Sequence, residues 1–171
     1  MSMIKIIGVG LTFVLGFTLT SVSVFTPGWI YVSGQVGNLK KSESFGIVPY
    51  NANLDGWFNI ASWFMFISFA AYILIIINYC IVGFKLNHHE SDRDIRHALF
   101  PMPGLCFLVI GFEAAAFTLF IINYDSYRSF YSYADFVELS VSLGYSAYLA
   151  MAAAVVTLVA GSLSIHVALC S

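Results

Sequence analysis

Four long apolar stretches, separated by short polar segments, constrain this chain more than any other feature of its sequence. They fall at about residues 4–25, 57–84, 99–123 and 138–169. An α-helix of about 20 apolar residues crosses the roughly 30 Å hydrocarbon core of a bilayer, and each stretch reaches that length. The pattern predicts an all-α membrane protein whose four transmembrane helices form a left-handed bundle.

The composition also places the chain in a membrane. Hydrophobic residues make up 60% of it and charged residues 9%, whereas a soluble domain normally carries about a quarter charged residues. Its formal net charge of −2, without a polybasic patch, excludes a nucleic-acid partner. Because nearly all of its 171 residues belong to spans or to the loops between them, we expect one domain surrounded by membrane lipid.

The first stretch has a competing interpretation as a secretory signal peptide. Lys5 supplies a charged start, and Ser21-Val22-Ser23 is an acceptable small-residue cleavage site. Its apolar run is longer than the 7 to 15 residues or so of a signal core. We therefore expect a helix that is retained.

The positive charges give the orientation. Four spans put both termini on one side of the membrane, together with a loop over residues 85–98 and the basic residues Lys5, Lys85, Arg93 and Arg96. The other side holds loops 26–56 and 124–137, with Lys40, Lys41 and Arg128. Basic residues are more frequent in cytoplasmic loops, so the charges favour cytoplasmic termini with loops 26–56 and 124–137 outside. We expect the membrane to be the plasma membrane.

The first outer loop contains a β-strand pattern. Tyr31-Val32-Ser33 and residues 44–48 are rich in β-branched and aromatic side chains, and the segment between them contains Gly34, Gly37 and Asn38. Such residues favour turns, so the loop predicts a small extracellular β-hairpin or sheet. Two strands alone are only marginally stable in water. We expect this hairpin to pack on the second outer loop or on a partner protein.

The second outer loop is dense in aromatic residues between Tyr124 and Phe136. Aromatic side chains at this density act as anchors at the membrane interface or as energetic centres of protein contacts. Both interpretations stay open. We nominate as partner contacts the following residues of the two outer loops: Trp29, Phe45, Ile47, Tyr127, Phe130, Tyr131, Tyr133 and Phe136.

Several motifs stand where one membrane-protein superfamily has its own. Trp29 follows the first stretch, and Gly46-Ile47-Val48 falls at about the spacing of a Gly-Leu-Trp motif. Residues 127–131, residues 144–149 with the small residues after them, and Leu169-Cys170 match its second loop and fourth helix. In these motifs the chain resembles the claudin and peripheral myelin protein superfamily. The resemblance implies a claudin-like tetraspan without enzymatic activity.

The chain also differs from claudins. Their two cysteines in the first outer loop are absent, with Pro49 and Tyr50 near the first position. We therefore expect no outer disulfide and a smaller outer sheet. The sequence ends at Ser171 without the terminal valine motif of many claudins, so we expect no scaffold binding through such a tail.

Glu113 is the one carboxylate near the middle of a predicted span. An ionised acidic side chain at the middle of the membrane costs on the order of several kcal/mol unless it is paired, and protonation avoids that cost. The residues that we expect at its depth are Thr18, Ser68 and Tyr148. A role as a protonated carboxyl group that bridges two helices is favoured over a proton relay, since no second intramembrane carboxylate or histidine continues a path.

The remaining candidate sites are weak. The loop at residues 85–98 contains three histidines, but it lacks the ligand spacing of a zinc site, so we expect a solvated linker and no metal or cofactor. No catalytic constellation is present in the sequence, which predicts that the protein is not an enzyme. Cys170, next to the end of a span, is a candidate for palmitoylation.

Two functions remain open. The first is cell adhesion at a cell junction, where the outer loops contact neighbouring molecules by self-association or with other proteins. The second is the role of an auxiliary subunit that binds beside a channel, a receptor or another membrane complex.

Overall fold

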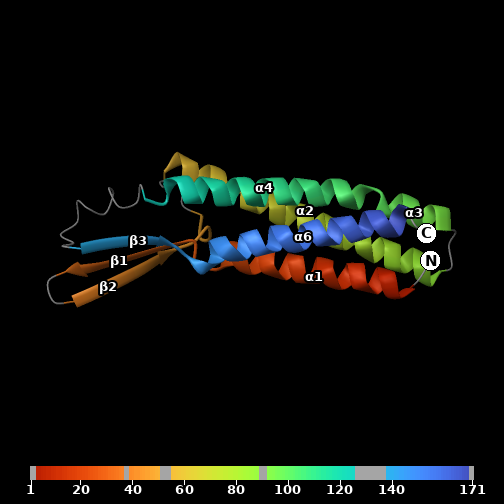
Figure 1. Cartoon of the computed structure of the whole chain (residues 1–171), viewed down its shortest axis with the longest axis horizontal. Coiled ribbons are helices and arrows are strands. Elements are labelled where there is room, and N and C mark those ends of the chain that lie inside the picture. The colour runs from red at the N-terminus through yellow and green to blue at the C-terminus, as the bar shows by residue number, and fades with distance from the viewer. Residues whose placement is uncertain (1–2, 37–38, 51–54, 89–91, 126–137, 170–171) are drawn as a thin grey trace.

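Four long helices lie side by side along the long axis of the protein, and a small sheet extends that axis at one end (Figure 1). The computed structural model describes residues 3–36, 39–50, 55–88, 92–125 and 138–169. Its elements, in chain order, are α1 (Met3–Phe25), β1 (Ile30–Val36), β2 (Leu39–Phe45), α2 (Gly56–Asn87), α3 (Asp92–Leu99), α4 (Pro101–Asn123), β3 (Glu138–Leu143) and α6 (Tyr145–Leu169). Both termini lie at the end opposite the sheet (Figure 1).

The prediction of four membrane-spanning helices is confirmed. Within the described residues, α1, α2, α4 together with the end of α3, and α6 are long and apolar enough to cross a bilayer. The described loop between α2 and α4 is partly helical, because α2 continues to Asn87 and α3 follows at Asp92. Handedness of the bundle stays a prediction.

The helices contact one another around a ring. α1 packs on α2 and α6, and α4 also packs on α2 and α6. Consequently α1 and α4 face each other across one diagonal of the bundle, and α2 and α6 face each other across the second. The first and last of these helices, α1 and α6, are thus neighbours in the bundle.

The outer sheet has three antiparallel strands in the order β2-β1-β3. We expected residues 138–143 to begin the fourth helix, and that prediction was wrong, because they form β3 and α6 begins at Tyr145. Leu139, Val141 and Leu143 alternate with serines, which is the period of a strand. Pairing with β1 also provides hydrogen-bond partners for backbone N–H and C=O groups of β3. The predicted second strand was misplaced, since Ile47 and Val48 come after β2.

The buried apolar residues form two clusters along the axis. One cluster fills the half of the bundle nearer the termini and includes Phe13, Ile75 and Val109. The second joins the outer half of the bundle to the sheet and includes Trp29 and Phe120. The sheet is therefore part of the same packed body as the helices.

Candidate functional site

The outer sheet has two faces of different chemistry, because successive residues of a strand point to opposite sides. On one face lie the rows Ile30–Phe45–Leu143 and Val32–Glu43–Val141, and Ile30 and Val32 are buried. The opposite face, which we call the serine face, includes Tyr31, Ser33, Ser42, Ser44, Ser140 and Ser142. Most of the serine face is exposed, and the Tyr31 side chain at its base is 46% exposed.

Trp29 fixes the base of the sheet to the bundle. Its side chain is fully buried, and its indole Nε1 donates a hydrogen bond of 2.7 Å to the Ser23 carbonyl oxygen at the end of α1. The indole packs on Phe120 of α4 with 4.4 Å between ring centroids, and Phe120 contacts Phe58 of α2. One side chain at the start of the first outer loop therefore contacts groups from several elements.

Backbone hydrogen bonds join the same region to the last helix. The Gly144 N–H donates to the Trp29 carbonyl over 2.9 Å, and the Ser146 N–H donates to the Gly28 carbonyl over 2.8 Å. The Trp29 N–H donates to the carbonyl of Phe45 over 2.9 Å, so β1 is held on both sides. Gly144 approaches so closely that an added Cβ would overlap the Gly28 carbonyl group.

Hydroxyl groups complete this joint. Ser23 Oγ donates to the Ser146 carbonyl oxygen over 2.8 Å, and Thr26 Oγ1 and Ser146 Oγ share a hydrogen bond of 2.7 Å. We call the residues of the joint the collar: Ser23, Thr26, Gly28, Trp29, Gly144 and Ser146. The collar binds the end of α1, the base of β1 and the start of α6 into one unit.

The nominated contact residues do not all reach the surface. Trp29 and Ile47 are fully buried, so they pack inside the protein and offer a partner no surface. Phe45 is half-buried. The other nominated contacts lie outside the described residues: Tyr127, Phe130, Tyr131, Tyr133 and Phe136. Cys170 also lies outside the described residues.

Exposed aromatic residues that we did not nominate follow β2 and lie on α2. Tyr50 is 44% exposed, and the centroid of its ring lies 6.1 Å from the ring centroid of Trp63 and 6.3 Å from that of Phe66. Trp63 is 57% exposed on α2. Aromatic rings at a span end are typical of the membrane interface. In the sequence, the aromatic residues at the start of the second apolar stretch are the pattern that indicates this interface.

Glu113 is completely buried on α4. Its Oε1 accepts a hydrogen bond of 2.7 Å from Thr20 Oγ1 on α1, and among the described residues its buried Oε2 has no hydrogen-bond partner. The expected neighbour Thr18 was wrong, because it faces outward and donates to the carbonyl of Val14. Thr20 lies two residues further, about 200° around the helix, and therefore faces the bundle interior. Of the other expected neighbours, Ser68 Oγ donates to the Val109 carbonyl instead, and Tyr148 is 59% exposed.

Thr20 and Glu113 connect one diagonal of the bundle, and a second hydrogen bond connects the other. Tyr72 on α2 and Thr157 on α6 share a hydrogen bond of 2.5 Å. The Thr157 hydroxyl donates to the Ala153 carbonyl, so Tyr72 is the donor to Thr157. Gly16 leaves the space for the Tyr72 hydroxyl, which an added Cβ would overlap. We call the two hydrogen bonds the cross-braces.

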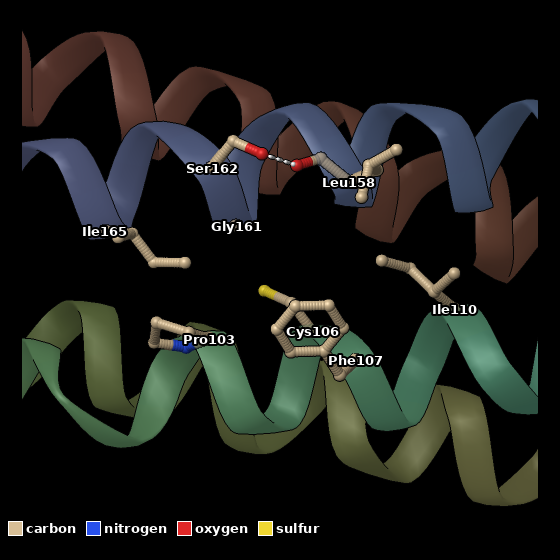
Figure 2. A pocket seen from close by; sticks show the side chains of 8 residues that line it. All are labelled: Pro103, Cys106, Phe107, Ile110, Leu158, Gly161, Ser162 and Ile165. Atoms are coloured by element: carbon tan, nitrogen blue, oxygen red, sulfur yellow. Dashed lines mark hydrogen bonds between the residues drawn. The ribbon is translucent and has the colours of Figure 1, made fainter.

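A shallow groove lies on the outside of the bundle between α4 and α6 (Figure 2). Cys106 points from α4 toward Gly161, and the Ser162 hydroxyl donates to the Leu158 carbonyl over 2.8 Å (Figure 2). Its lining residues are Pro103, Cys106, Phe107, Ile110, Leu158, Gly161, Ser162 and Ile165. The groove is apolar, and its one hydroxyl is already bonded within α6, so it has little means of selecting a polar ligand.

Comparison with protein families identifies the family of this chain. A family model described as "Tight junction protein, Claudin-like" matches residues 1–170. No curated protein matches the chain.

Proposed function

Because this chain belongs to the claudin-like family of tight junction proteins, we propose that it acts at cell junctions, where its outer sheet contacts other proteins. The observation that carries the proposal is the position of the sheet, which stands at the end of the bundle away from both termini (Figure 1). A multi-pass membrane protein of this shape presents its sheet beyond the lipid.

The collar supports this role. A sheet that serves as a contact surface binds best when its orientation is fixed before contact, because little conformational freedom is then lost on binding. Trp29 and the hydrogen bonds between Gly28, Trp29, Gly144 and Ser146 supply that rigidity. Phe45 and the aromatic residues of the loop after α4 remain proposed contacts.

The location follows from the same proposal. We place the protein in the plasma membrane with both termini in the cytoplasm and the sheet outside, and we assign it no enzymatic activity. Its partners are other membrane proteins, including further copies of itself.

The test is localisation in a mixed culture of cells that express the protein and cells that do not. We expect enrichment at borders between two expressing cells, with the wild-type distribution retained by a Trp63→Ala variant, whose side chain is 57% exposed on α2 below the sheet. Enrichment on every border of an expressing cell would indicate a different protein as the partner and would keep the junction role. A uniform distribution, together with co-purification of a larger channel or receptor, would contradict the proposal and support the auxiliary-subunit function.

A further inference from the structure

β2 forms one edge of the outer sheet. The strand order is β2-β1-β3, and among the described residues nothing pairs with the far side of β2. An edge strand presents unpaired N–H and C=O groups that another strand can bind. This edge is therefore a surface for strand addition.

The register shows which backbone groups face outward. The Trp29 carbonyl accepts from Gly144 on the β3 side, so the next residue, Ile30, turns its N–H and C=O toward β2. Residues of an antiparallel ladder alternate in this respect. The partners of β1 on β2, including Phe45 and Glu43, thus face β1, and Ser42 and Ser44 turn their backbone groups to the open edge.

The sequence of β2 is complementary to itself when it is reversed. In an antiparallel pair of two β2 strands centred on Ser42, residue 41 stands opposite residue 43 of the second copy. This register pairs Lys41 with Glu43 twice and Leu39 with Phe45 twice. Opposite charges and apolar pairs across strands are stabilising.

Neighbouring registers are unfavourable. The outward-facing backbone N–H and C=O groups of the two strands must lie opposite each other to form hydrogen bonds. The pair can therefore shift only to registers in which outward-facing residues again meet outward-facing residues. Centring the pair on residue 41 sets Lys41 against Lys41, and centring it on residue 43 sets Glu43 against Glu43. Like charges directly opposite are destabilising, so the charge pattern selects the register centred on Ser42.

We propose that β2 binds β2 of a second copy of this chain in an antiparallel pair centred on Ser42, which makes one continuous sheet from two molecules. The inference rests on the proposed junction function and names its partner. The interface is isologous, as in most homodimers, because the same residues meet from both sides.

The direction of the strands decides where the second copy lies. β2 runs along the long axis of the protein, parallel to the helices (Figure 1). An antiparallel partner strand therefore belongs to a molecule that points the opposite way along the membrane normal, and that molecule sits in a facing membrane. A strand of 7 residues at roughly 3.4 Å per residue spans about 24 Å, so the proposal predicts a narrow gap between the two membranes.

The first experiment measures tethering between vesicles. The full-length protein is reconstituted into phosphatidylcholine vesicles of two fluorescent colours, and coincidence of the colours reports tethering. A neutral lipid is chosen because charge-changing variants then gain no attraction to the membrane itself. We expect wild-type vesicles to tether, with many weak pairs acting together.

Charge reversal then tests the register. Lys41→Glu vesicles and Glu43→Lys vesicles should each lose self-tethering by about tenfold or more, because every charge pair becomes repulsive. A mixture of the two variants should recover to within about twofold of wild type, since each new charge then meets its opposite on the other variant. Recovery also shows that both variants are folded.

A cysteine at the centre of the register gives an independent readout. Cα atoms of a hydrogen-bonded antiparallel pair lie about 5.5 Å apart, within the range of a disulfide. Ser42→Cys should therefore form a dimer under mild oxidation between vesicles of different colour. Ser140→Cys, on the same serine face but in the other edge strand, is the matched control and should stay monomeric.

The outcomes separate this inference from the junction function. If wild-type vesicles tether but the mixture of charge variants does no better than either variant alone, or if Ser140→Cys crosslinks as well as Ser42→Cys, the β2 pairing is wrong and adhesion stands. If wild-type vesicles do not tether, the β2 pairing is wrong, and enrichment at cell borders then decides whether the junction role survives with a different partner.

Discussion

The collar and the cross-braces both join segments far apart in the sequence, but they use different groups. In the collar, backbone N–H and C=O groups of Gly28, Trp29 and Gly144 meet directly. In the middle of the bundle each helix satisfies its own backbone, so only side chains can connect helices, as Thr20 and Tyr72 do. The protein is thus joined by main-chain groups together with hydroxyl groups at the outer end, and through side chains inside the membrane.

This difference indicates where the structure is most sensitive to substitution. An interhelical side-chain hydrogen bond in a membrane protein contributes about 0.6 kcal/mol on average, because the separated helices find other partners. Buried side chains and close backbone contacts in the collar leave no such alternative. We therefore expect substitutions in the collar to lower the free energy of unfolding more than substitutions in the cross-braces.

The largest expected effect is that of Trp29→Ala. Removing a fully buried indole and its hydrogen bond to Ser23 should lower the free energy of unfolding by about 3–5 kcal/mol, measured by denaturant titration in mild detergent micelles. The control is Trp63→Ala, whose side chain is 57% exposed and should cost about 1 kcal/mol or less. Equal losses for the two variants would show that the collar is not a special point of the structure.

Gly144→Ala should be the next most harmful. The added methyl group would overlap the Gly28 carbonyl, and overpacking against backbone typically costs about 1–3 kcal/mol. Gly8→Ala in α1 is the matched control, since its Cβ would meet nothing within 4 Å. The two variants are compared by their thermal unfolding midpoints, and a midpoint for Gly144→Ala as high as that of the control would contradict the close contact in the collar.

Glu113 tests the first cross-brace. Glu113→Ala removes the acceptor of Thr20 and leaves a small cavity, which should cost about 2 kcal/mol in the detergent titration. Glu113→Gln retains an acceptor oxygen, so we expect it to stay within about 1 kcal/mol of wild type. If the glutamine variant were as unstable as the alanine variant, Glu113 would do more than accept this hydrogen bond.

Tyr72→Phe should have the smallest effect of the series. It removes the hydroxyl that donates to Thr157 but keeps the ring, and Thr157 still donates to Ala153. The same titration should show a loss of about 0.6–1 kcal/mol. Thr18→Val is the comparison, because the Thr18 hydroxyl bonds only within its own helix, and it should change stability by less than about 0.5 kcal/mol. A loss for Tyr72→Phe as large as that for Gly144→Ala would remove the distinction between the two regions.

The spans were predictable from the sequence, whereas the partners of individual residues were not. The predicted end of the first helix at about residue 25 agrees with Phe25. The identity of the Glu113 partner depends on which side of α1 faces α4, and depth alone suggested Thr18 instead of Thr20. Trp29 was nominated as a partner contact because it lies in the first outer loop, but that position in the sequence does not show which side chains cover it.

The assignment of residues 138–143 failed for a related reason. An apolar stretch that leads into a helix resembles part of that helix, and the alternation of Leu139, Val141 and Leu143 with serines is short. These residues become a strand because β1, more than 100 residues earlier, offers them an unpaired edge.

The sequence by itself determined that this protein crosses a membrane several times and carries a small β element beyond the spans. Both properties depend on the hydropathy and the strand propensity of residues that are neighbours in the chain. The tertiary structure alone decided that Trp29 is buried in the collar, that Thr20 meets Glu113 across 93 positions of sequence, and that no described residue pairs with the outer edge of β2. These facts depend on how segments distant in the chain are placed in space, and the local preferences of a sequence pattern do not specify that placement.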